Sequence, residues 1–126
     1  MAANVKDMLA AANQAVPQLT PEQARAKLRE GDVVIVDVRD PSEVAQSGKI
    51  KGAVNISRGM LEFRADPDVP SHNPALQKEK TVLVYCASGG RSALGGKTLK
   101  DMGYRSVFNI GGFKELADAG LETEPA

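Results

Sequence analysis

Cysteine is scarce in this sequence of 126 residues, which contains a single one, Cys86. One cysteine excludes a disulfide within the chain, and it excludes a metal site built mainly from cysteine ligands. We expect no metal. The thiol is left with three roles: burial in the core, chemical reactivity, or a crosslink between two chains.

A net charge of one sign is also missing, because 16 Lys and Arg residues balance 16 Asp and Glu residues. Proteins that bind nucleic acid normally carry a strong basic excess, so we expect no nucleic-acid partner. The balance is uneven along the chain, since residues 86–106 have a local charge of +3, from Arg91, Lys97, Lys100, Arg105 and Asp101. If the fold holds that basic stretch near Cys86, it favours anionic ligands.

Long apolar runs are absent, and no segment approaches the roughly 20 apolar residues of a membrane span. The first residues do not resemble a secretory signal, because Lys6 is followed by the acid Asp7 and residues 10–14 are too polar. They do not resemble an arginine-rich transit peptide either, since the first arginine is Arg25. We therefore expect a cytoplasmic protein with no membrane partner.

In place of these features, the sequence has apolar runs typical of strands, with helix signals between them. Residues 33–38 and 81–85 are rich in β-branched residues and do not alternate with polar ones, so both faces of each strand should be covered. Weaker strand signals lie at 53–55 and 106–110. Residues 18–19 can add a short edge strand.

The helix signals include two clear start sites. Thr20 is an N-cap residue with proline after it and Gln23 three residues on, which predicts a helix ending at Gly31. Asp40 followed by proline predicts a short helix ending near 47–48. Apolar spacing predicts three more helices, over 5–16, 91–102 and 112–119. Strands alternating with helices indicate one α/β domain with a mostly parallel sheet and an extra N-terminal helix.

Two regions do not follow this alternation. Residues 58–80 contain three prolines and no long periodic run, so we expect a surface excursion with one helical turn near 60–63. From Glu115 onward the chain holds four acids and no base, and we expect this tail to be solvated and partly frayed. The expected division is an N-terminal helical extension (1–17), a domain (18–121) and an acidic tail (122–126).

Cys86 stands directly after the strand 81–85, where small residues lead into a helix. The residues that follow it are Ala87, Ser88, Gly89, Gly90, Arg91 and Ser92. Backbone N–H groups of such a loop, together with the helix dipole, bind an anion and lower the pKa of a cysteine. Cys86 is therefore the candidate nucleophile, and the six residues after it are the candidate binding loop. The alternative is an inert cysteine that packs in the core like any small apolar residue.

Charged or titratable side chains, within this loop and elsewhere, are candidates for supporting Cys86. Arg91 can add positive charge beside an anionic ligand, or it can pair with a carboxylate such as Asp37 or Glu43 and brace the loop. Asp37 and Arg39 follow the neighbouring strand, where α/β sheets open their crevice, so they either contact substrate or support the structure. His72 lies in the excursion, where a lone histidine is usually solvated, which disfavours a Cys–His hydrolase.

Residues 86–92 resemble the Cys-x-x-Gly-x-Arg-Ser active loop of the single-domain rhodanese (sulfurtransferase) family. Further segments resemble that family in the same order: 36–43 its Asp-x-Arg strand end, 48–56 its Gly-His-Ile-x-Gly-Ala-x-Asn-Ile segment, and 103–104 and 109–113 its closing glycine and aromatic motifs. The resemblance covers residues 19–120. It departs from the family at Lys49, where histidine is usual, and at Lys51, where proline is frequent.

The resemblance implies a five-stranded, largely parallel sheet flanked by helices, with Cys86 as the acceptor of sulfane sulfur. In the family, the thiolate attacks the outer sulfur of a donor such as thiosulfate, and sulfite leaves. The loop N–H groups from Ala87 to Ser92 would hold the resulting persulfide. The partners implied are a small anionic sulfur donor and a thiol, cyanide or protein-thiol acceptor, and no metal or organic cofactor is required.

Two other functions are considered beside sulfur transfer. One is a non-catalytic rhodanese-homology module that binds partners or senses redox state, but such modules often lose the cysteine or the glycines that this chain retains. The other is a phosphatase or arsenate reductase, whose loop has five residues between cysteine and arginine, whereas four separate Cys86 from Arg91. Glu43 stands where some two-domain rhodaneses place a substrate-binding arginine, so the preferred donor is open.

Overall fold

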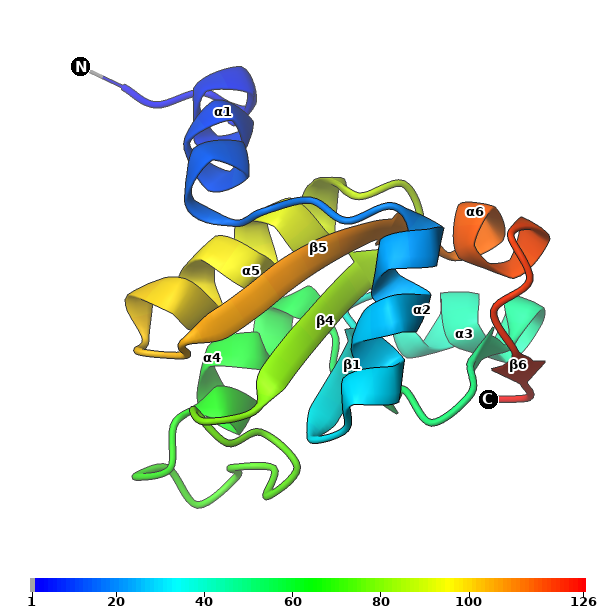
Figure 1. Cartoon of the computed structure of the whole chain (residues 1–126). Coiled ribbons are helices and arrows are strands. Elements are labelled where there is room, and N and C mark those ends of the chain that lie inside the picture. Colours follow the sequence, from blue (N-terminus) through cyan, green and yellow to red (C-terminus); the bar gives the residue numbers. More distant parts are fainter. Residues whose placement is uncertain (1) are drawn as a thin grey trace.

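Strands β1 (Val33–Asp37) and β4 (Thr81–Cys86) lie side by side at the centre of a parallel sheet in the computed structural model, which describes residues 2–126. The short strand β3 (Val54–Asn55) pairs with β1, and β5 (Ser106–Gly112) pairs with β4. The strand order is β3-β1-β4-β5, and every neighbouring pair is parallel. Figure 1 shows β1, β4 and β5 side by side. The predicted α/β class with a parallel sheet is confirmed.

The helices begin close to where the sequence predicts them. They are α1 (Val5–Ala15), α2 (Pro21–Glu30), α3 (Pro41–Ser47), the 3-10 turn η1 (Arg58–Met60), α4 (Leu61–Ala65), α5 (Gly90–Asp101) and α6 (Phe113–Asp118). At the start of α2, the Thr20 hydroxyl accepts from the Gln23 amide at 3.2 Å, and the Gln23 side chain accepts from the Thr20 amide at 2.9 Å. Among residues 2–126, no helix has the length and apolar character needed to cross a membrane.

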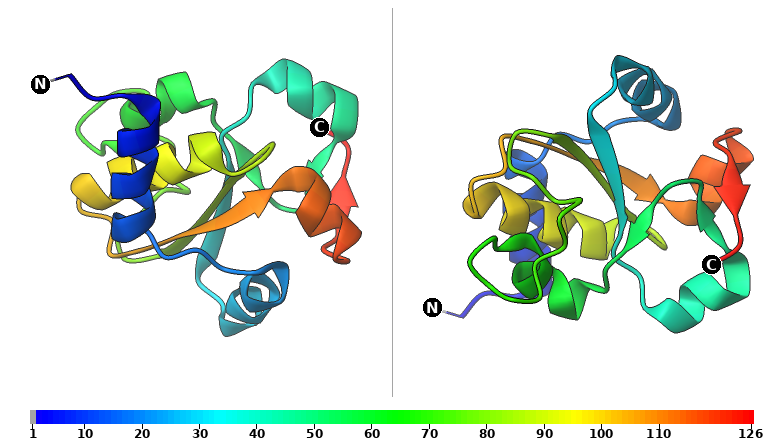
Figure 2. Two further views of the ribbon diagram at one scale, coloured as in Figure 1. Left: turned by 90° about the horizontal axis from the view of Figure 1, so that it is seen from above. Right: turned by 90° about the horizontal axis from the view of Figure 1, so that it is seen from below.

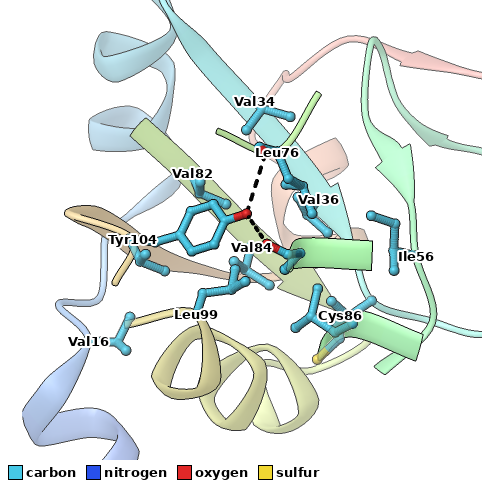
Figure 3. Close-up of a cluster of buried hydrophobic side chains, with 14 residues drawn as sticks. Val16, Val34, Val36, Ile56, Leu76, Val82, Val84, Cys86, Leu99 and Tyr104 are labelled. Atoms are coloured by element: carbon cyan, nitrogen blue, oxygen red, sulfur yellow. Dashed lines mark hydrogen bonds between the residues drawn. The ribbon is translucent and has the colours of Figure 1, made fainter. Parts of the chain in front are cut away.

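Alternate side chains of the central strands enter two separate cores, one on each face of the sheet. Seen from above, α1, α4 and α5 lie on one side and α2 on the other (Figure 2). On the α5 side the buried side chains include Val34, Val36, Val82, Val84, Cys86, Leu61 and Leu99. On the α2 side they include Ala24, Ile35, Leu83, Tyr85, Ile110 and Leu116. Because Cys86 has the parity of Val82 and Val84, the strand aims its side chain at the α5 face (Figure 3).

The C-terminal residues differ from the sequence-based expectation. Instead of fraying, residues Thr123–Glu124 form strand β6, which pairs antiparallel with β2 (Lys49–Ile50). The prediction of a frayed tail is wrong, because its acids find partners on β2 and the turn after it. Lys49 lies 3.4 Å from Glu124, Lys51 lies 3.3 Å from Glu122, and the Gly52 amide donates to Glu124 at 2.8 Å. The two lysines that depart from the family motif therefore have acidic partners in this tail.

The main sheet has four strands, and the fifth is reduced to one bridge at its edge. Gln18 pairs in parallel with Asn109 of β5, through the Asn109 amide to Pro17 and the Leu19 amide to Asn109, both at 3.0 Å. The predicted edge strand at 18–19 is thus present in rudimentary form. This strand does not extend beyond one bridge because Thr20 already caps α2, which turns the chain away from the sheet.

The proline-rich excursion follows η1 and α4, which supply the helical turn predicted near 60–63. Tyr104, on the α5 side of the molecule, contacts two separate segments of this region through its hydroxyl. Its buried hydroxyl donates to the carbonyl oxygen of Ala65 at 2.7 Å and lies 3.4 Å from that of Leu76 (Figure 3). A buried hydrogen bond between distant segments contributes more than one in contact with water, because the alternative is an unsatisfied carbonyl.

Replacing Tyr104 by phenylalanine should lower the free energy of unfolding by about 1–2 kcal/mol, since the buried Ala65 carbonyl loses its donor while the ring remains. Chemical denaturation measures this change. Ser71→Ala is the matched control, because Ser71 makes the same kind of bond to the Phe63 carbonyl at an exposed position and should change stability by about 0.5 kcal/mol or less. Equal effects of the two substitutions would contradict this assignment.

Candidate active site

Cys86 is the last residue of β4, and its side chain is enclosed by the loop that leads into α5. The residue is only 1 % exposed. The backbone amide of Gly89 donates to the sulfur at 3.0 Å, and the hydroxyl of Ser92 lies 3.5 Å from it. Two donors from the start of α5 thus converge on one sulfur atom.

These donors favour the ionised form of the thiol. Burial raises the pKa of Cys86, but hydrogen bonds from the Ser92 hydroxyl and from the amides of Ser92, Ser88 and Gly89 outweigh burial and bring the pKa below its ordinary value. The loop therefore stabilises a negative charge on sulfur by polar contacts.

The loop can curl around the sulfur because glycine occupies two of the tightest positions. Gly89 has φ +104°, a left-handed conformation that other residues rarely adopt. Gly112 of β5 has no unusual φ but lies directly under the loop: a Cβ placed there would overlap the carbonyl oxygen of Ala87 and lie 3.0 Å from its carbonyl carbon. Glycine at 112 therefore lets the loop backbone pack on the neighbouring strand.

Asn109 of β5 braces the loop from below. Its Nδ2 donates to the carbonyl of Gly89 at 3.1 Å, and its Oδ1 accepts from the Ser92 hydroxyl at 2.8 Å and from the Gly111 amide at 3.0 Å. The residue is only 6 % exposed. Asn109 lies within the family motif at 109–113 but was not among the predicted site residues. Its parity with the core residue Val107, which places both on the α5 face, was the available signal.

Arg91 pairs with Glu43, one of the two carboxylates considered as its partner. Two guanidinium nitrogens donate to the two Glu43 oxygens at 2.7 and 2.9 Å, which links the start of α5 to α3. This pairing, with the Asp40 amide that also donates to Glu43, lowers the pKa of Glu43 to about 2. Of the two carboxylates named for Arg91, Glu43 is therefore its partner, and Asp37 pairs with Arg39.

The basic stretch after Cys86 does not gather at the loop. Lys97 lies seven residues beyond the first residue of α5, which is about 10 Å along the helix. It pairs with Asp101 at 2.9 Å, and Lys100 bonds the carbonyl of Arg105 at 3.5 Å. The condition under which this charge would favour anionic ligands is therefore not met, because α5 carries Lys97 and Lys100 away from the loop.

Asp37 and Arg39 form a buried ion pair. The Arg39 guanidinium donates to both carboxylate oxygens of Asp37, the closest at 2.7 Å. Arg39 is 3 % exposed and Asp37 is 0 % exposed. The same guanidinium donates to the Ser47 hydroxyl and the Gly48 carbonyl, each at 2.8 Å, and lies 4.5 Å from the ring centre of Phe113. These contacts tie β1 to the end of α3.

His72 is remote from this chemistry. Its Nε2 lies 2.9 Å from the carbonyl oxygen of Leu76, within the excursion. The excursion leads into the beginning of β4, whereas Cys86 is at the other end of that strand (Figure 1). The histidine therefore does not meet the thiol.

A cavity of about 340 Å³ adjoins the loop on the side of the N-terminal helix. Its walls come from α1, from the loop, and from β5 and α6, and they include Asn13, Gln18, Ser88, Gly89, Gly90, Asn109 and Glu115. Among residues 2–126 there is no cluster of three or more His, Cys, Asp or Glu side chains that could hold a metal. The polar groups that the loop presents to the sulfur are donors, which suit an anion.

A sequence model of the rhodanese-like domain matches residues 20–119. The chain belongs to the rhodanese-like domain family. Helix α1 and the strand β6 lie outside the matched range. The matched range includes the Cys86 loop, the Asp37–Arg39 pair and the Gly112 contact.

Named relatives of this rhodanese-like domain include sulfurtransferases. The thiosulfate sulfurtransferase PspE of Escherichia coli is 37 % identical over 82 residues, which cover 65 % of this chain and 72 % of that protein. A tRNA uridine(34) hydroxylase of Synechocystis sp. is 34 % identical over 94 residues, 75 % of this chain. The matched part is only 33 % of that hydroxylase, so this chain corresponds to about a third of its length.

Two solved structures extend the similarity over nearly the whole chain. A Rhodopseudomonas palustris protein of unknown function, described as a possible tyrosine phosphatase, is 46 % identical with a TM-score of 0.90, covering 98 % of this chain and 96 % of that one. The polysulfide-sulfur transferase homodimer of Wolinella succinogenes is 34 % identical with a TM-score of 0.75, covering 96 % and 87 %.

Replacing Gly112 by alanine should displace the loop, because the new methyl group would overlap the backbone of Ala87. We expect a loss of about 2 kcal/mol in the free energy of unfolding and a change in the alkylation rate of Cys86. Gly59→Ala is the matched control, since a Cβ there meets nothing within 4 Å. Wild-type stability and thiol reactivity in Gly112→Ala would show that the contact is unimportant.

Proposed function

We propose that this rhodanese-like domain is a sulfurtransferase that carries sulfane sulfur as a persulfide on Cys86. The observation that carries the proposal is the position of the Cys86 sulfur, which accepts from the Gly89 amide at 3.0 Å and has the Ser92 hydroxyl at 3.5 Å. Because the terminal sulfur of a persulfide is anionic, a ring of N–H and O–H donors stabilises it without protonating it. The proposed binding residues are those from Ala87 to Ser92.

In the proposed first half-reaction, the Cys86 thiolate attacks the outer sulfur of a donor such as thiosulfate. The S–S bond of the donor breaks, and sulfite leaves with the electron pair. In the second half-reaction, an acceptor thiolate or cyanide attacks the terminal sulfur of the persulfide, and the Cys86 thiolate leaves. Two half-reactions that share one covalent intermediate predict ping-pong kinetics.

The depth of Cys86 bears on the choice of substrate. At 1 % exposure, its sulfur is reached more easily by a single protruding sulfur atom than by a tetrahedral phosphate ester. A phosphatase loop also needs an arginine facing the oxyanion, whereas the Arg91 guanidinium is bound on two nitrogens by Glu43. These features favour sulfur transfer, although the Rhodopseudomonas palustris neighbour is described as a possible tyrosine phosphatase.

We do not extend tRNA hydroxylation to this chain. The relatives named for it are three times longer than the matched region, as the Synechocystis example shows with 33 % covered. A protein that grips tRNA through its phosphates also needs a basic excess, and this chain has a net charge of zero. A donor that fits the small, donor-lined loop is a sulfane anion such as thiosulfate, a glutathione persulfide or a polysulfide.

Incubation with thiosulfate, followed by intact-mass measurement, should show the gain of one sulfur atom per chain. Cyanide added afterwards should remove that sulfur and release thiocyanate. Cys86→Ser is the control and should gain nothing under the same conditions. Polysulfide and glutathione persulfide, tested in parallel, rank the donors.

Two results would overturn this proposal. An unmodified wild-type protein with every donor would indicate a non-catalytic module. Hydrolysis of an aryl phosphate that is lost in Cys86→Ser, without sulfur loading, would indicate a phosphatase.

A further inference from the structure

Ser92 has one hydroxyl proton and three acceptors within reach. Its Oγ lies 2.8 Å from Asn109 Oδ1, 3.1 Å from the Gly89 carbonyl oxygen and 3.5 Å from the Cys86 sulfur. A serine hydroxyl donates one hydrogen bond at a time, so these acceptors compete for it. The Ser92 residue is completely buried.

The neighbours of Asn109 fix which way its amide points. The Gly111 amide can only donate, so the atom 3.0 Å from it must be the Asn109 oxygen. The Gly89 carbonyl can only accept, so the atom 3.1 Å from it must be the Asn109 nitrogen. Since Oδ1 cannot donate, the Ser92 hydroxyl 2.8 Å away has to donate to it.

The main chain holds Asn109 in this place. Its amide and carbonyl bond Pro17 and Leu19, both at 3.0 Å, in the bridge that joins the N-terminal segment to β5. The register between β4 and β5 also shifts just beyond Asn109, so that Tyr85 faces Gly111. At this bulge the Gly111 amide donates a hydrogen bond to Asn109 Oδ1.

We propose that Asn109 is a positioning residue that competes with the Cys86 sulfur for the hydroxyl proton of Ser92. While the sulfur is a neutral thiol, the hydroxyl donates to Asn109 Oδ1. When the sulfur becomes a thiolate or a persulfide anion, the hydroxyl turns to the sulfur, and Oδ1 retains the Gly111 amide. No bond is made or broken apart from this exchange of hydrogen-bond acceptors.

This competition adjusts the reactivity of Cys86 in sulfur transfer, a role that rests on the proposed function. A thiolate that is stabilised too strongly is abundant but a weak nucleophile, and the best attacking thiol has a pKa near the ambient pH. By holding the Ser92 proton, Asn109 keeps the thiolate of Cys86 from excessive stabilisation. The same hydroxyl is free to turn to the persulfide once sulfur has been taken up.

Several charged groups also surround the sulfur and must be held constant in a test. Arg91 of α5 is close enough for its charge to interact with the Cys86 thiolate, and Glu43 of α3 pairs with it. Glu115 of α6 lines the adjoining cavity, and Asp37 of β1 is bound to Arg39. None of these residues changes in the variants proposed below.

The test is the pH dependence of Cys86 alkylation by iodoacetamide, which reports the pKa of the thiol and needs no sulfur donor. Asn109→Ala should lower that pKa by about one unit, so that at a pH below both values the thiolate is about tenfold more abundant and alkylation, after the loss of nucleophilicity, is about threefold faster. The limiting rate at high pH should fall about threefold, because the thiolate is a weaker nucleophile. Asn109→Asp keeps the acceptor and adds negative charge, so it should raise the pKa instead.

A merely structural role for Asn109 predicts a different pattern. Losing a buried brace would loosen the Gly89 donor, so Asn109→Ala would raise the pKa of Cys86 rather than lower it. The decisive control is the Ser92→Ala background, in which Asn109→Ala should have no effect on the pKa because the contested proton is gone. A pKa that is unchanged or raised in Asn109→Ala, or lowered equally without Ser92, would overturn the proposal.

Two further outcomes are informative. If Asn109→Ala does not fold, as judged by thermal unfolding, Asn109→Asp is compared with and without Ser92, because the competition predicts a larger rise in the pKa of Cys86 when Ser92 is present, whereas the added charge alone raises it equally in both. An equal rise in the two backgrounds would then overturn the proposal. Failure of sulfur loading in the wild type would overturn the proposed function and leave the alkylation pattern unchanged, so the two failures can be told apart.

Discussion

The tight junction between β4 and α5 is the constraint on which the rest of the site depends. Within four residues the chain must leave a buried strand, expose Ala87 and Ser88, and begin a helix whose first amides face back to the Cys86 sulfur. Gly89 supplies the left-handed residue that this path requires, and Gly112 supplies the space beneath it. The polarity around the sulfur is thus a consequence of backbone geometry more than of charged side chains.

The charged side chains near the loop stabilise its surroundings. Arg39 is buried with Asp37 and joins β1 to the end of α3. Arg91 reaches Glu43 at the start of α3, so that helix is connected to the site at both ends. Removing one partner of such a buried pair leaves an uncompensated charge, which makes the Asp37–Arg39 contact part of the framework.

The segments outside the matched family range also bear on the site. The bridge at Gln18 bonds the main chain of Asn109, and α1 forms one wall of the cavity beside the loop. At the other end of the chain, β6 pairs with β2 and supplies acids to Lys49 and Lys51. Both terminal segments therefore contact residues within the matched range: the N-terminal segment contacts Asn109, and the C-terminal segment contacts Lys49 and Lys51, which depart from the family motif.

Much of the fold followed from local signals, since capping residues at Thr20 and Asp40 and the β-branched runs act within a few residues. The sequence also determined that Cys86 ends a buried strand before a glycine-rich helix start. Strand β6, the Arg91–Glu43 pair and the contacts of Asn109 depended on residues far apart in the chain, and only the tertiary structure decided them. The reason is physical: a hydrogen bond of a buried side chain is set by the position of its partner, and that position exists only once the sheet and its helices have packed.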